Sequence, residues 1–142
     1  MDKIGHFFSS FHIGLFFYKV FGDFENLNPQ QIEQLGKADL ALDKVITASP
    51  TTQDAYLFKA RIQVLLKNGT LVAKNYEDFI ATASKRDPAE LIKMKSKLVE
   101  AHNNLGVIYA ETDKAKAKDN FDKTLGIDPA NQYAAEQLKY LK

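Results

Sequence analysis

Cysteine and tryptophan are absent from this sequence of 142 residues, and glycine (seven residues) and proline (four) are scarce. Without cysteine there is no disulfide, no thiolate nucleophile and no thiolate metal ligand. The shortage of glycine and proline leaves little room for long loops or low-complexity linkers. The length and the 45% apolar content therefore predict one folded domain made mostly of regular elements.

An excess of charge of either sign is also lacking. Lys and Arg together number 19 against 18 Asp and Glu, and no basic run is present, so we expect no nucleic-acid partner. An uninterrupted apolar run is missing too. Residues 7–24 are rich in phenylalanine, but Ser9, His12 and Lys19 interrupt them and no small-residue cleavage site follows. We expect no membrane span and no signal peptide there.

The compartment is left open by these features. The cytoplasm is slightly favoured, and the periplasm is the alternative if the natural chain begins upstream of Met1.

The residue sets that mark most catalytic and metal sites are missing as well. The histidines His6, His12 and His102 form no i, i+4 pair, and the sequence has no carboxylate-rich metal loop, phosphate-binding loop or nucleophile elbow. His102 is interpreted as a packing residue, because an isolated histidine is weak evidence for function. The sequence therefore predicts no catalytic residue, no metal and no cofactor.

An internal repeat is what the sequence does contain. The stretches "HIGLFFYK", "FKARIQVL" and "NLGVIYAE" place a small residue at Gly14, Ala60 and Gly106, spaced 46 residues apart each time. A second apolar stretch follows each of them with helical spacing, as in Ala117 and Phe121, and then stops near a proline. Three helix-turn-helix units are predicted, and their prolines are Pro50, Pro88 and Pro129.

The third unit resembles the tetratricopeptide repeat (TPR) family, whose pattern is an aromatic residue, Leu-Gly, Tyr, Ala, Phe and Pro over about 34 residues. Six parts of that pattern, with Leu-Gly counted as one, agree in type and spacing. They are His102 in the aromatic position, Leu105-Gly106, Tyr109, Ala117, Phe121 and Pro129.

The other two units depart from the TPR pattern. In the second, Tyr56 fits, but Lys59 replaces the leucine and Gln63 replaces the tyrosine. In the first, Ser10 replaces the aromatic residue while Gly14 fits. HEAT-like repeats are the alternative because their period is nearer 46 residues, but they do not predict Leu-Gly with Tyr four positions after the Leu.

The resemblance implies an all-α fold, a right-handed superhelix of helical hairpins known as an α-solenoid. We expect a single domain with repeats at about 7–50, 53–88 and 89–129 and a capping helix at about 130–142. The residues in excess of the usual period fall in a helix that starts at Asn28-Pro29, in a turn at 68–70, and in a continuous extension of the helix that runs from Pro88 to Glu111.

In the TPR family the first helix of each pair lines a concave groove that holds peptides or partner helices, and the resemblance implies the same surface here. The positions where chaperone-binding TPR modules carry a Lys/Asn clamp hold other residues, including Phe11 and Glu100, so no such clamp is expected. The predicted partner-binding residues are Phe8, Phe11, Leu15, Tyr18, Leu57, Arg61, Asn103 and Val107.

Three functional hypotheses follow. The leading one is a non-catalytic scaffold module that binds an apolar peptide or helix in the groove. The second is that residues 7–24 are buried, either in a homodimer through the N-terminal helix or beneath upstream repeats of a longer protein of which this chain is the C-terminal piece. The third, an enzyme, has no supporting set of residues.

Overall fold

The computed structural model describes residues 27–141, and every regular element in that range is an α-helix, which confirms the predicted all-α class. Residues 7–24, with the predicted groove residues Phe8, Phe11, Leu15 and Tyr18, lie outside it. The chain divides into two compact units, the first ending at Thr82 and the second beginning at Ala83. The expected single domain and its repeat boundaries stay a prediction.

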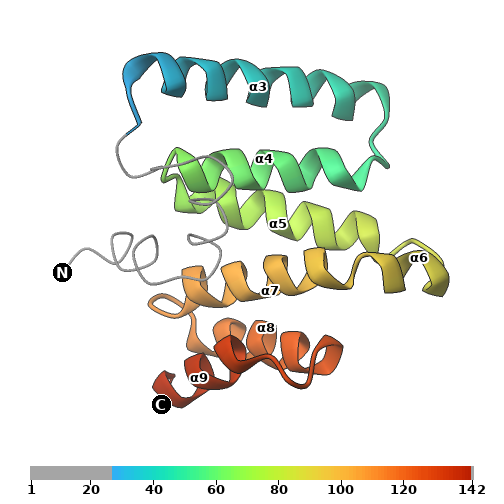
Figure 1. Ribbon diagram of the computed structural model, residues 1–142, viewed down its shortest axis with the longest axis vertical. Coiled ribbons are helices and arrows are strands. Elements are labelled where there is room, and N and C mark those ends of the chain that lie inside the picture. The colour runs from blue at the N-terminus through green and yellow to red at the C-terminus, as the bar shows by residue number, and fades with distance from the viewer. Residues whose placement is uncertain (1–26, 142) are drawn as a thin grey trace. The chain divides into compact units, whose positions relative to one another are not determined.

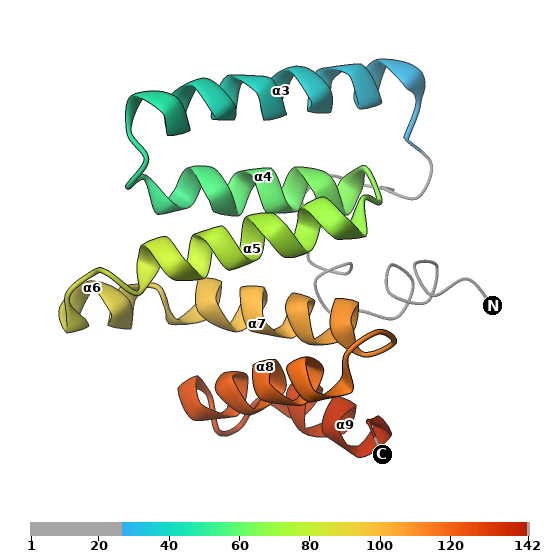
Figure 2. The same ribbon diagram turned by 180° about the vertical axis from the view of Figure 1, so that it is seen from behind.

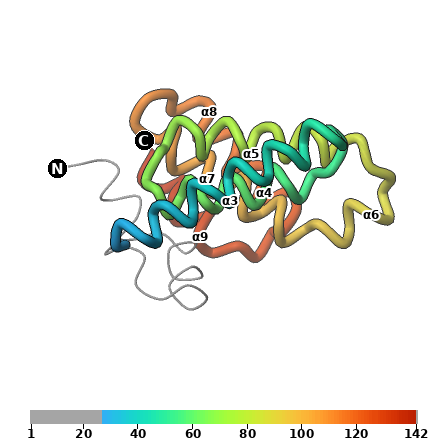
Figure 3. The backbone as a smooth tube through the Cα atoms, turned by 90° about the horizontal axis from the view of Figure 1, so that it is seen from above, coloured from blue at the N-terminus to red at the C-terminus, as the bar shows by residue number. Residues whose placement is uncertain are grey.

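The first unit contains helices α3 (Pro29–Ala48), α4 (Gln53–Leu65) and α5 (Gly69–Ala83), each running antiparallel to the one before it (Figures 1 and 3). Helix α3 begins where the sequence predicts. The Asn28 side chain accepts a hydrogen bond from the Gln31 N–H at 2.8 Å, and the Gln31 side chain accepts one from the Asn28 N–H at 2.9 Å. This capping box satisfies two backbone donors that the first turn would otherwise leave unpaired.

The turn between α4 and α5 comes slightly earlier than predicted. Lys67 has a φ of 59°, in the left-handed region that ends helices, and the Asn68 side chain accepts a hydrogen bond from the Leu71 N–H at 3.2 Å. Because Asn68 caps the next helix, Gly69 and Thr70 belong to α5 instead of the turn.

Burial is distributed unequally within the first unit. On α4, side chains on most of the circumference are buried, among them Leu57 and Val64, and α5 buries Tyr76 and Phe79. Helix α3 has no buried residue, and the side chain of Val45 is 42% exposed. The described residues therefore leave α3 with an uncovered apolar surface.

The second unit contains α6 (Pro88–Lys93), α7 (Lys95–Tyr109), α8 (Lys114–Ile127) and α9 (Gln132–Tyr140) (Figure 2). The continuous helix predicted from Pro88 to Glu111 is wrong, because the chain breaks at Met94. There φ is −99° and ψ is 7°, and the Met94 N–H bonds to the Leu91 carbonyl in a tight turn. The Met94 side chain at the break is buried, whereas α6 has no buried residue.

Packing between α7 and α8 follows the repeat pattern. Gly106 of α7 lies directly against Phe121 of α8, and a Cβ atom added at Gly106 would stand 2.5 Å from the ring Cζ. Ala117, one turn before Phe121 on α8, is fully buried, and Tyr133 of α9 meets Phe121 edge-on with ring centroids 6.4 Å apart. The predicted packing roles of Gly106, Ala117 and Phe121 are thus confirmed.

Candidate interaction surfaces

Four of the predicted groove residues fall in the described part of the chain, two in each unit. Leu57 on α4 is 0% exposed and Asn103 on α7 is 8% exposed, so neither offers an accessible surface to a partner in this structure. Arg61 and Val107 are half-buried. Only these last two are placed where a partner could touch them, and the groove as a whole stays a prediction.

Phe58 is an exposed aromatic residue that the groove assignment did not include. Its side chain is 46% exposed on α4, and the guanidinium carbon of Arg61 lies 5.7 Å from its ring centroid. A cation over an aromatic face attracts the ring, and the i, i+3 spacing on a helix brings the two side chains together. That spacing was readable in the sequence. We call Phe58 and Arg61 the aromatic–arginine pair.

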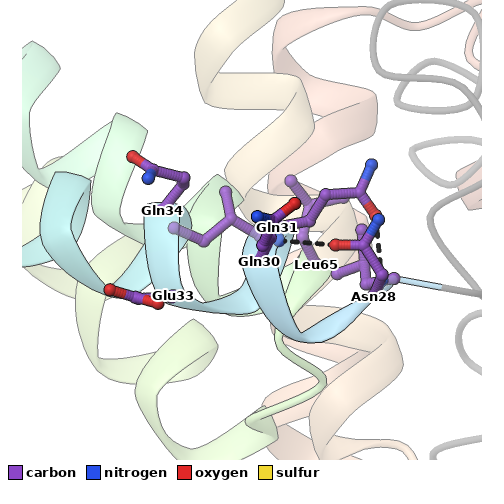
Figure 4. Close-up of a pocket in the computed structure, with 8 residues that line it drawn as sticks. Asn28, Gln30, Gln31, Glu33, Gln34 and Leu65 are labelled. Carbon is purple, nitrogen blue, oxygen red and sulfur yellow. Dashed lines mark hydrogen bonds between the residues drawn. The ribbon is translucent and has the colours of Figure 1, made fainter.

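A cavity of about 620 Å³ lies beside the first turns of α3. Figure 4 shows Asn28 and Gln31 joined by the two hydrogen bonds of the capping box, with Leu65 of α4 beside them. Glu33 is the single charged group in its described lining, and it forms an exposed ion pair with Lys37 at 3.1 Å. Amides and leucines can hold a peptide backbone and an apolar side chain, but they supply no acid–base chemistry. The lining is Leu27, Asn28, Gln30, Gln31, Glu33, Gln34, Leu35 and Leu65.

Lys59 and Gln63, the two residues of the second repeat that differ from the TPR pattern, belong to one polar cluster with Asp39 and Asp43. The Nζ atom of Lys59 lies 2.8 Å from Asp39 Oδ2 and 2.8 Å from Asp43 Oδ1, and the Gln63 amide donates to Asp39 Oδ1 at 3.2 Å. Burial alone would lower the pKa of Lys59, but the hydrogen bonds and charges of Asp39 and Asp43 together outweigh it and raise the pKa above its ordinary value. Lys59 is therefore a cation that connects α4 to α3.

His102 has the packing role that the sequence predicted. It is buried, and its Nδ1 lies 3.0 Å from Oδ1 of Asn120, an acceptor that requires the proton on Nδ1. Burial lowers the pKa of His102, so the ring is neutral at pH 7. In residues 27–141 no three histidine, aspartate or glutamate side chains are grouped in a way that could hold a metal ion. Nor is any helix in this range long and apolar enough to cross a membrane.

Comparison with known proteins identifies the fold. No protein-family model and no curated protein matches the chain. A solved structure, the C-terminal part of a TPR repeat-containing protein from Cytophaga hutchinsonii, resembles it with a TM-score of 0.65 and 23% identity. The match covers 96% of this chain and 60% of that structure, so this chain spans less than two thirds of its length. The likeness establishes an all-α fold of TPR-type helical hairpins, an α-solenoid.

Proposed function

We propose that this chain is a non-catalytic protein-interaction module whose partner presents an apolar helix or peptide. The observation that carries the proposal is the aromatic–arginine pair, because Phe58 stays 46% exposed on a helix that otherwise buries most of its surface. Aromatic residues and arginine are enriched at protein interfaces and often supply most of the binding energy. The TPR-type fold supports the same proposal, since helical-repeat proteins use extended surfaces for binding.

A capture experiment tests this proposal. The tagged chain and its variants are incubated with lysate of the source organism, and captured proteins are quantified by mass spectrometry. Phe58→Asp, and separately the double change of Phe11 and Leu15 to Asp, should each remove the principal captured protein, with helical far-UV circular dichroism retained. Ile92→Asp is the matched control, because Ile92 is 65% exposed on α6 and outside the predicted groove. Equal capture by all variants would contradict the proposal.

Self-association is a second candidate, supported by the uncovered surface of α3. Ile32, Leu40 and Val45 are 42–64% exposed along that helix and none of its residues is buried, so contact with a second copy would remove apolar area from water. Light scattering during serial dilution distinguishes the two candidates. A dimer that resists dilution, and that dissociates in a Leu40→Asp and Val45→Asp double variant, supports self-association. A monomer at all concentrations rejects it.

A further inference from the structure

Three helix faces in the first unit surround a second, polar cavity of about 360 Å³. On each helix most of the lining residues are three or four positions apart, so they share one face. The cavity is smaller than the one beside the start of α3, and its lining is mostly charged or amide-bearing. We call this cavity the polar pocket. It is lined by Asp39, Asp43 and Ile46 from α3, Tyr56, Lys59 and Gln63 from α4, and Leu71, Lys74, Asn75 and Asp78 from α5.

The polar pocket has one more negative charge than positive. Lys59 is held by Asp39 and Asp43, and Lys74 pairs with Asp78 at 2.9 Å, so three carboxylates face two ammonium groups. The Lys59 contact uses one oxygen of Asp43, whose side chain is 53% exposed and retains further acceptor capacity. An incoming cation would neutralise the remaining charge.

Asn75 points independently to a missing partner. The residue is only 5% exposed, and its position on α5, next to Lys74 and three before Asp78, directs the side chain to the lined face. Within residues 27–141 its amide has no hydrogen-bond partner. Most side-chain amides that are this little exposed are hydrogen-bonded. The polar pocket thus contains an amide acceptor and donor that no other described residue bonds, and both are available to an entering group.

The chemistry of the lining selects the class of ligand. No metal-holding group of acidic side chains is present among the described residues, and both ammonium groups already have carboxylate partners, which disfavours an anion. A guanidinium carries one positive charge and several coplanar donors, which suit a carboxylate and an amide oxygen at once. Its methylene stem would lie against Ile46 and Leu71. A volume of about 360 Å³ is at the low end for ligand sites and suits one side chain.

We propose that the polar pocket receives an arginine side chain from a protein partner, with its guanidinium between Asp43 and Asn75. The proposal goes beyond the apolar binding surface and does not require it, because neither Phe58 nor Arg61 lines this pocket. The chain would then contact partners through a second, charge-selective surface formed by α3, α4 and α5.

Nuclear magnetic resonance of the ¹⁵N-labelled full chain tests the proposal with the peptide Ac-Gly-Arg-Gly-NH2. As the peptide concentration rises, we expect the chemical shifts of the Asn75 side-chain amide and of the Asp78 backbone amide to change and then to reach a plateau. The citrulline peptide, which is nearly isosteric but uncharged, and the glutamate peptide should bind about tenfold more weakly or not at all, since each lacks the charge-assisted bond. Asn75→Leu and Asp43→Asn should each weaken arginine binding by about the same factor. Asp122→Asn removes an exposed carboxylate of α8 that lines neither cavity, and it should leave binding unchanged.

Shifts spread over other surfaces, equal binding of the citrulline or glutamate peptide, or no saturation would overturn the proposal. Undiminished binding in Asp43→Asn would do the same, and that exposed position keeps the test valid even if Asn75→Leu does not fold.

Discussion

Gly106 is important for packing because it has no side chain: the ring of Phe121 occupies the space where a Cβ atom would lie. The closest atoms to a methyl group added at this position would be Cζ, Cε1 and Cε2 of Phe121, at 2.5, 2.6 and 2.7 Å. Phe121 is fully buried and also contacts Tyr133, so its ring is part of the packed core. The close approach of α7 and α8 therefore depends on glycine at this position.

Gly106→Ala should lower the free energy of unfolding by roughly 1–3 kcal/mol, the usual cost of overpacking a closed core. Urea denaturation followed by circular dichroism measures the change. Gly126→Ala in α8 is the control, because no atom apart from the adjoining backbone of its own helix and its chain neighbours lies within 4 Å of the added Cβ. Alanine there should be neutral or stabilising by up to about 1 kcal/mol. A Gly106→Ala protein as stable as the Gly126→Ala protein would contradict the assigned packing.

His102 predicts how stability depends on pH. Its pKa is lowered in the folded state, so below pH 6.5 the unfolded chain binds a proton that the folded chain does not. Stability from this residue is complete above pH 6.5 and falls as the pH drops below it. Urea midpoints measured between about pH 7.5 and about pH 5.5, above the range where most carboxylates titrate, should decrease. In His102→Gln the decrease should be smaller, and an equal decrease would refute the assignment.

The polar cluster acts at the scale of helix pairing, because Lys59 links α4 to α3. The Lys59 side chain is 11% exposed and that of Asp39 is 19% exposed, so this ion pair is largely shielded from water. Removing the partner of a buried charge costs more than the pair itself contributes, since the remaining group stays desolvated. The α3–α4 contact thus has a polar specificity that the usual leucine at this position would not give.

Lys59→Met should lower the free energy of unfolding by roughly 1–3 kcal/mol, measured by urea denaturation. Adding Asp39→Leu should recover much of that loss, because the uncompensated carboxylate is removed at the same time. Lys37→Met is the control: its ion pair with Glu33 is 63% exposed on both sides, so we expect a change within about 0.5 kcal/mol. No difference between Lys59→Met and Lys37→Met would count against the structural role of the cluster.

At the scale of the whole molecule, burial varies strongly from one helix to another. Helix α3 contains 20 residues and buries none of them, whereas α4 and α7 each bury a run of consecutive positions. Regions with few buried contacts open more often than cores do, and amide hydrogen exchange reports that opening. Local stability is therefore expected to be uneven along the chain.

Hydrogen–deuterium exchange followed by mass spectrometry should find peptides from α3 exchanging fastest among the long helices, and peptides from α4, α7 and α8 slowest. The physical reason is that opening α3 exposes little apolar surface that is not exposed already. Because α3 has a complete capping box, an Asn28→Ala variant provides an internal control: it should speed exchange in the first turn of α3 and leave α7 unchanged. Equal protection of α3 and α7 would contradict the prediction.

Much of this architecture was predictable because it depends on local patterns. Asn28 and Pro29 carry the signals of a helix start, and the third repeat identified Gly106 and Phe121 as partners from their spacing alone. The break at Met94 was not predictable, since residues 88–111 keep a helical pattern throughout and the burial of Met94 depends on residues distant in the sequence.

The sequence by itself determined the all-helical class, the start of α3 at Asn28-Pro29 and the small-to-large pairing of the third repeat, because each rests on residues close together in the chain or on one fixed period. Only the tertiary structure decided which side chains stay accessible: Leu57 is buried while its neighbour Phe58 is not. It also brought Asp39, Lys59 and Asn75 from three helices to one pocket. Which side chains come into contact depends on the orientation of each helix about its own axis, and that orientation is set by the packing of the whole unit.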